Sequence, residues 1–429
     1  MFGFANFLLL ALFAAAVFDL IFALARGGGL RGALHGLWNT PHLLFGQQLA
    51  EWRLQLGRIL FAAGLAAYEI SVVFCNSMAR QNWAWVQGVM SPVLEWLAFL
   101  CFGAKILFGT RYTWRELLAG GALYFIARWV YFNSQNIWWI GIVVAVLAAK
   151  DVPLRRPLQV YFASGCAAMA VVLALHFAGI VAPDLTSERM GALRGTYGYG
   201  HPNTFGGLVF GLVLAYALLR AQKVRWVDCL LVFAIGVFLL VGPASRSAAL
   251  CTLALAVGLV FCRLRAGHSV PRWWPGTCAG MVGLTAAVSY LLPLLVIKVG
   301  PWNNDIGPAW LAKLDSLLTC RISLTWMAYR LLDVKIAGQV FNWPTVDNSF
   351  AFALFQFGPV VAALLGIQFA AALWGHAKQG RRVEVCCLFA MLAYAYMEVQ
   401  PFHLTTNPTA LLLCGAVFAQ TSARWQKIE

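Results

Sequence analysis

The stretch around His201 carries residue types that suit chemistry at the edge of a membrane. Gly198 and Gly200 precede the histidine, and glycine lets the backbone approach a ligand closely. Pro202 fits the first turn of a helix, which Asn203 or Thr204 would cap. The free N–H groups of a helix start attract anions, and a neutral histidine beside them can accept a proton from a hydroxyl. The other interpretation of His201 is a hydrogen-bonded structural residue.

Arginines lie at three further places where a charge next to hydrocarbon needs an explanation. Arg189 and Arg194 precede the histidine, and Arg246 lies in a turn of small residues between two apolar runs. An arginine so placed is a candidate for function, unless its side chain extends to the lipid headgroups. Arg321 follows an amphipathic stretch, where the alternative is the solvated face of a helix.

Two carboxylates occupy similar borders. Asp347 stands before Asn348 and a long apolar run, where it is either a helix cap or a general base. Glu398 closes another apolar run, with His403 close behind it. An acid in that position either pairs with an arginine or binds a polar substrate.

The composition indicates which elements must position these residues. The 429-residue chain is 61% hydrophobic and 11% charged, with a mean hydropathy of +0.75. Its apolar runs match the length of membrane helices and exceed that of barrel strands. We therefore predict an all-α polytopic membrane protein with about thirteen spans: 4–25, 58–77, 88–109, 115–132, 136–150, 158–182, 204–220, 226–242, 247–263, 276–298, 348–375, 384–400 and 405–420.

Basic residues predict the direction of these spans. Five clusters near residues 150–156, 220–225, 263–272, 378–382 and 424–427 are each separated by two spans, so all five can lie in the cytoplasm together. This explains the net charge of +15 without nucleic acid and places the C-terminus inside. The candidate residues then share the extracytoplasmic side, with 299–347 as the one sizeable outer helical segment. Arginines on that side suggest an anionic ligand such as a phosphate.

The chain offers little sign of further domains or of metal chemistry. Without internal repeats or low-complexity linkers, residues 1–429 are predicted to form one integral membrane domain. The eleven cysteines lie mostly in apolar runs and show no zinc spacing. No aspartate-rich outer motif would hold Mg²⁺ or Mn²⁺, so we expect neither a metal nor a cofactor.

Four motifs in order resemble a known family. They are Arg189…Arg194 with Tyr-Gly-Tyr-Gly-His201-Pro-Asn203, then Ala-Ser-Arg246-Ser, then Leu-Asp315 through Arg321-Ile-Ser, and lastly Val-Asp347-Asn348-Ser-Phe with Gly358; Glu398 and Asn407-Pro408 add to the likeness. Together they resemble the Wzy-type bacterial polysaccharide polymerases, within the group that includes the O-antigen ligases. The resemblance covers residues 150–420, whereas residues 1–150 match only as generic spans.

The resemblance implies a metal-independent glycosyltransferase in the bacterial plasma membrane, active at its outer face. Its substrate would be an oligosaccharide repeat on undecaprenyl diphosphate, polymerised into O-antigen, capsule or exopolysaccharide. Its partners would be membrane lipid, a flippase and chain-length regulators. By hypothesis, fixed donors stabilise the leaving diphosphate and a nearby base orients or deprotonates the acceptor hydroxyl. The diphosphate and sugar contacts would be Arg189, Arg194, Asn203, Arg246, Arg321, Asn348 and His403, and the candidate bases His201, Asp347 and Glu398.

Two alternatives remain at this point. Ligases usually carry histidine-asparagine where this chain has Asp347-Asn348, which favours a polymerase but leaves the base open. A ligase would move finished polymer onto lipid A-core. A non-enzymatic polysaccharide or lipid transporter would gather polar groups at the bilayer midplane in repeated halves, a pattern that the sequence does not show.

Overall fold

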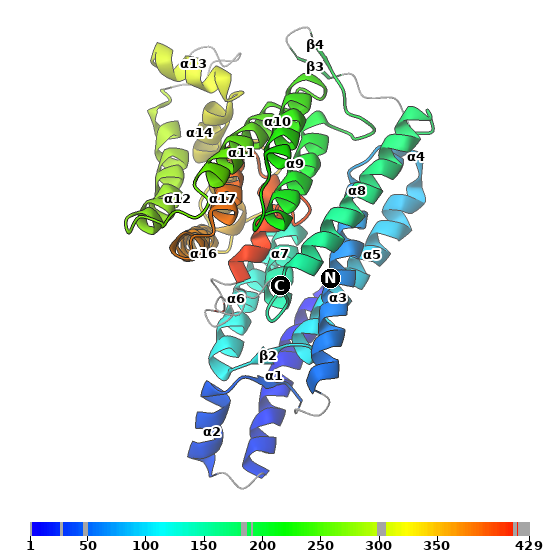
Figure 1. The fold of residues 1–429 in the computed structure, drawn as a ribbon, viewed down its shortest axis with the longest axis vertical. Helices are drawn as coiled ribbons and strands as arrows, with labels where there is room; N and C mark the ends of the chain where they lie inside the picture. Colours follow the sequence, from blue (N-terminus) through cyan, green and yellow to red (C-terminus); the bar gives the residue numbers. More distant parts are fainter. Residues whose placement is uncertain are drawn as a thin grey trace.

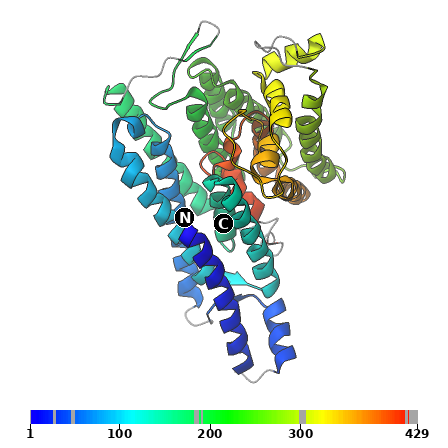
Figure 2. The ribbon, with the colours of Figure 1, turned by 180° about the vertical axis from the view of Figure 1, so that it is seen from behind.

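The computed structural model describes residues 2–25, 29–45, 50–181, 187–189, 192–297, 306–414 and 418, and this part of the chain is mostly helical. Two short antiparallel pairs, β1 (His42–Leu43) with β2 (Arg111–Tyr112) and β3 (Ser187–Arg189) with β4 (Ala192–Arg194), depart from the all-α expectation. Figures 1 and 2 show α13 and the β3–β4 pair at one extremity and α2 at the other. The principal helices are α1 (Phe2–Ala25), α2 (Leu30–Asn39), α3 (Ala50–Cys75), α4 (Ala79–Asn82), α5 (Ser91–Phe108), α6 (Trp114–Ser134), α7 (Ile137–Ala148), α8 (Arg155–Phe177), α9 (Pro202–Leu219), α10 (Trp226–Val241), α11 (Arg246–Leu264), α12 (Trp274–Leu291), α13 (Ala309–Leu317), α14 (Arg321–Leu331), α15 (Ser349–Phe352), α16 (Pro359–Lys378) and α17 (Arg382–Met397).

Eight helices in the described residues are long and apolar enough to cross a membrane. They include α1, α3, α8, α9, α11 and α16, together with α5 extended by the π-turn η1 (Val86–Met90) and α12 extended by η2 (Leu292–Leu295). The apolar helices α7 and α10 are shorter, α6 carries Arg115, Glu116 and Arg128, and α17 has 16 residues. The structure thus has eight helices that could span a membrane, and the count of thirteen spans is not confirmed.

Two of the predicted spans are not single long helices in the structure. The run 348–375 is interrupted: α15 and the π-helix η3 (Ala353–Phe357) end at Gly358, and α16 begins at Pro359. A Cβ on Gly358 would lie 2.1 Å from the carbonyl oxygen of Ile336, and its φ of +86° favours glycine. The run 405–420 forms only the short 3₁₀ helix η5 (Pro408–Leu413) in its described part, after the cap Asn407.

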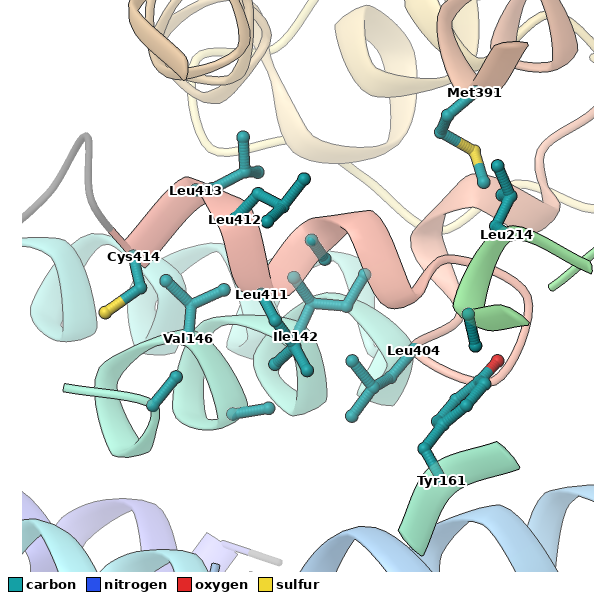
Figure 3. Packing of buried hydrophobic residues seen from close by; sticks show 14 of the residues in the cluster. Ile142, Val146, Tyr161, Leu214, Met391, Leu404, Leu411, Leu412, Leu413 and Cys414 are labelled. Atoms are coloured by element: carbon teal, nitrogen blue, oxygen red, sulfur yellow. The ribbon is translucent and has the colours of Figure 1, made fainter. Parts of the chain in front are cut away.

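The short helix η5 lies at the centre of the packed interior rather than along its edge. Figure 3 shows Leu411 facing Ile142 and Val146 of α7, with Met391 of α17 and Leu214 of α9 beyond the end of the segment that is nearer to Leu404. These side chains belong to one large cluster of buried apolar residues that reaches from α1 to Phe418. The prediction of a single domain is not tested by this packing and stays a prediction.

Helices α9, α11 and α17 each join the same two regions. One region contains the starts of α9 (Pro202) and α11 (Arg246) and the end of α17 (Met397). The other contains the opposite ends of the same helices, next to the basic residues Arg220, Arg263 and Arg382. The described part of the 299–347 segment contains the short helices α13 and α14, which pack together through Leu311 and Ile322, followed by residues 332–347 without a helix. Arg321 at the start of α14 reaches Ser247 in the first region.

Candidate functional site

A chain of hydrogen bonds links four of the expected site residues in the region where α9 and α11 begin and α17 ends. Arg194 Nη2 donates to Asn203 Oδ1 at 2.9 Å, and Asn203 Nδ2 donates to Glu398 Oε1 at 3.1 Å. The same carboxylate oxygen accepts from Arg321 Nη2 at 2.8 Å. Arg194, Arg321 and Glu398 are all at least 92% buried. Three parts of the chain that are far apart in the sequence thus meet in one buried, charged network, which we call the Arg321–Glu398 cluster.

The start of α9 aims Asn203 into this cluster. His201 is the helix cap, because its ring nitrogen Nδ1 accepts from the backbone N–H of Asn203 at 3.1 Å. The expected cap at Asn203 or Thr204 is therefore wrong, and the Asn203 side chain is left to join Arg194 and Glu398. His201 itself is exposed. Its role as a base stays a prediction.

Arg321 is held more completely than an arginine on a solvated helix face. It begins α14 and donates to the carbonyl oxygens of Leu318 and Met397 and to Ser247 Oγ, besides Glu398. Asp315 does not pair with it. That carboxylate caps α14 instead, accepting from the N–H groups of Ile322 at 2.8 Å and Ser323 at 3.2 Å. Arg321 thereby fixes the position of Glu398.

The turn before α11 brings Arg246 to the edge of the cluster. Arg194 donates to the carbonyl oxygens of Pro243 and Ala244, and Arg321 reaches Ser247. The two guanidinium groups therefore flank the first residue of α11, which is Arg246, and the Arg246 side chain is exposed. The two buried arginines thus contact residues on either side of Arg246.

Glu398 has the electrostatic surroundings of a group that exchanges protons. It caps the end of α17 in an extended conformation. Burial raises the pKa of its carboxyl to about 7, the negative charge of Asp347 raises it too, and Arg321 opposes both. A carboxyl with a pKa near neutrality accepts and releases a proton at physiological pH, as a general base must.

The remaining expected residues lie around the cluster in different ways. Asp347 is close enough to Glu398 to raise its pKa. Asn348 caps α15 through Oδ1 and donates from Nδ2 to Ser289 Oγ at 3.1 Å, so its amide holds α12 to α15.

His403 lies on Trp138, with ring centroids 3.7 Å apart, and burial lowers the pKa of His403 to about 3. A neutral imidazole supplies no charge to a phosphate. Arg189 lies in β3, and its side chain falls outside the described residues.

Sequence reasoning missed the small residues that let these segments approach. A Cβ on Gly206 would lie 2.2 Å from Ser245 Oγ, and one on Gly207 would lie 1.8 Å from Gln400 Oε1. Ser349 Oγ donates to the backbone oxygen of Glu398. The sequence did contain a sign of this close approach, because Gly206 and Gly207 lie about one turn into a helix that starts at a candidate site.

An apolar cavity adjoins the cluster. It lies between α7, α12, α16 and α17, and its lining includes Tyr290, Phe350 and Phe402 besides Ser349. In the described residues, no three metal-binding side chains gather in one place. The polar cluster thus borders on a surface suited to hydrocarbon.

Comparison of the chain with models of protein families, with curated proteins and with solved structures found no match.

Proposed function

We propose that this protein is a polysaccharide polymerase of the bacterial plasma membrane, which joins oligosaccharide repeats carried on undecaprenyl diphosphate. The observation that carries the proposal is the buried Arg321–Glu398 pair, joined through Asn203 to Arg194 beside exposed Arg246. It combines a base and a cluster of cations at one end of the helices, as transfer from a lipid diphosphate requires.

The reaction assigns one proton transfer to Glu398. The terminal hydroxyl of the incoming repeat attacks the anomeric carbon of the growing chain's reducing-end sugar, and its proton passes to the Glu398 carboxylate. The bond from that carbon to the diphosphate oxygen breaks, and undecaprenyl diphosphate leaves with the electron pair. Arg321 keeps the carboxylate in place, and Asn203 orients it through its amide.

The leaving diphosphate would meet Arg246 first, because that side chain is exposed at the edge of the cluster. Buried Arg194 adds positive potential behind it. Arginine forks match phosphate oxygens and supply this stabilisation without a metal.

The position of the basic residues supports an outward-facing site. Arg220, Arg263 and Arg382 mark the ends of α9, α11 and α17 opposite the cluster. If these basic ends face the cytoplasm, as in most membrane proteins, the cluster faces outward.

A strain lacking the protein tests the proposal. Its surface polysaccharide should run on a sugar-ladder gel as single repeats, and a plasmid copy should restore the ladder. Long chains left on the lipid carrier would instead indicate a ligase. Arg246→Glu should abolish the ladder while membrane fractions hold normal amounts of protein. A full ladder from Arg246→Glu would remove Arg246 from the site.

A further inference from the structure

A second charged region surrounds a cavity at the other ends of α9, α11 and α17. The cavity has a volume of about 780 Å³. Its cationic lining comes from four separate segments and comprises Arg155, Arg220, Lys223, Arg225, Arg263, Arg381 and Arg382. Glu384 is the one carboxylate that lines it in the described part of the chain. Positive-inside topology accounts for basic loops, but not for their convergence on one hollow.

Most of these cations are not used to hold the fold together. Arg220 pairs with Asp228 at 3.2 Å, and Arg382 donates to the backbone oxygens of His268 and Ser269. Among the residues that the structure describes, Arg155, Lys223, Arg225, Arg263 and Arg381 have no carboxylate within ion-pair distance. The cavity therefore carries an uncompensated positive charge.

His376 also lines this cavity, and one of its ring nitrogens is buried. Nδ1 of His376, on α16, is inaccessible to solvent and has no hydrogen-bond partner in the described residues. A buried polar atom without a partner costs free energy unless something binds it. Because Nδ1 has no accessible surface, an anion inside the cavity would meet the surrounding cations rather than this atom.

The surroundings of the cavity are those of a membrane interface. Trp226, Trp273 and Trp374 lie near the same ends of α10, α12 and α16, with 53%, 64% and 49% of their surfaces exposed. Exposed tryptophans concentrate at the level of lipid headgroups. Val227 and Leu230 of α10 are likewise exposed, next to Arg225. A ligand in the cavity can thus place an acyl chain along α10.

We infer that this basic cavity binds the phosphate headgroup of an acidic membrane phospholipid. The phosphodiester would lie among Arg225, Arg263 and Arg381, and the acyl chains along the exposed apolar face of α10. Basic pockets between helix ends select anionic lipids over zwitterionic ones by this electrostatic attraction. The inference does not depend on the proposed transferase reaction.

The test measures lipid retained by the full-length protein. The protein is placed in nanodiscs of phosphatidylcholine and phosphatidylglycerol, released, and analysed by native mass spectrometry. Arg225→Gln/Arg263→Gln/Arg381→Gln removes three cavity charges. The matched control Arg156→Gln/Arg272→Gln/Lys378→Gln removes three exposed charges at the same end that do not line the cavity. Inorganic phosphate serves as the soluble competitor.

The wild type and the control should retain phosphatidylglycerol in preference to phosphatidylcholine, and the cavity variant should bind it at least about tenfold more weakly. Millimolar inorganic phosphate should not displace the lipid. Equal loss in both triple variants, or equal retention, would overturn the site. Displacement by phosphate would overturn its assignment to a lipid. If the triple variant fails to fold, Arg263→Gln alone should weaken binding about threefold, and an unchanged affinity would refute the proposal.

Discussion

The two ends of α9, α11 and α17 hold cations in opposite ways. At the Arg321–Glu398 cluster the arginines Arg194 and Arg321 are buried and hydrogen-bonded, and Arg321 pairs with a carboxylate. At the basic cavity five cations lack a carboxylate within ion-pair distance in the described residues. Buried ion pairs give little or no net stability, because desolvation offsets their attraction. Their presence at one end is therefore better explained by function, and the exposed charges of the other end by topology and lipid.

The largest expected effect comes from removing the proposed base. Glu398→Gln preserves the shape of the side chain and its hydrogen bonds but cannot accept a proton. Polymer formation should fall by about 10² to 10⁴-fold. The measurement is the ladder from a deletion strain that carries the variant at wild-type membrane abundance. Glu51→Gln, an exposed acid at the start of α3, is the control and should leave the ladder unchanged. A normal ladder from Glu398→Gln would exclude this base.

Removing the partner of Glu398 should unfold the cluster. Arg321→Met leaves a buried carboxylate without its cation and should cost about 3–5 kcal/mol of stability. Arg272→Met, on an exposed position near the basic end, should stay within about 0.5 kcal/mol. Thermal unfolding in detergent compares the two.

A double variant separates the pair's structural role from its chemical one. Arg321→Met/Glu398→Leu removes both charges and should recover part of the lost stability without any activity. Recovery of activity in the double variant would contradict the catalytic assignment of Glu398.

The pH dependence follows from the same carboxyl. Its pKa in the folded protein is raised to about 7, so the base form is lost below neutrality. Polymerisation by the purified protein should fall about tenfold per pH unit below 7, and Glu398→Gln should lack this inflection.

The free energy of unfolding should change with pH in the opposite direction. The folded state binds the proton more tightly than the unfolded chain, so this contribution to stability is full below pH 4.5 and is lost as the pH rises through 7. A rate that is flat between pH 5.5 and 7 would contradict the first statement, and stability that does not fall as the pH rises through 7 would contradict the second.

The smallest effect concerns the close approach of α9 to the cluster. Gly207→Ala adds a Cβ that would lie 1.8 Å from Gln400 Oε1, so the side chains must shift at a cost of about 1–3 kcal/mol. Gly283→Ala on α12 meets nothing within 4 Å and should be neutral or stabilising by up to about 1 kcal/mol. Equal melting temperatures for the two variants would show that the approach is not tight.

The length of the apolar runs predicted several of the long helices, but it did not predict where some runs are interrupted. The long apolar runs of α3, α8 and α11 fall where they were expected. The run at 405–420 was also expected to be a span, yet Asn407 and Pro408 begin only a 3₁₀ helix in its described part. Apolar periodicity does not reveal whether a helix crosses a bilayer or fills the interior of a bundle.

The members of the Arg321–Glu398 cluster were easier to predict from the sequence than the contacts between them. Arg194, Asn203, Arg321 and Glu398 were all candidates from residue type and position at the ends of apolar runs. The pairing of Arg321 with Glu398 joins residues 77 positions apart, which no local spacing indicates. Local spacing also did not reveal that the ring of His201 caps α9, because a cap depends on the backbone geometry at a single residue.

Reconstitution tests the central claim most directly. The purified full-length chain in liposomes would receive undecaprenyl-diphosphate-linked repeats as the only sugar source, with wild type and Glu398→Gln compared side by side. The account predicts that the wild type releases undecaprenyl diphosphate and builds chains of two or more repeats, while Glu398→Gln leaves single repeats. Single repeats from active wild-type preparations, or equal chain growth by both proteins, would contradict it.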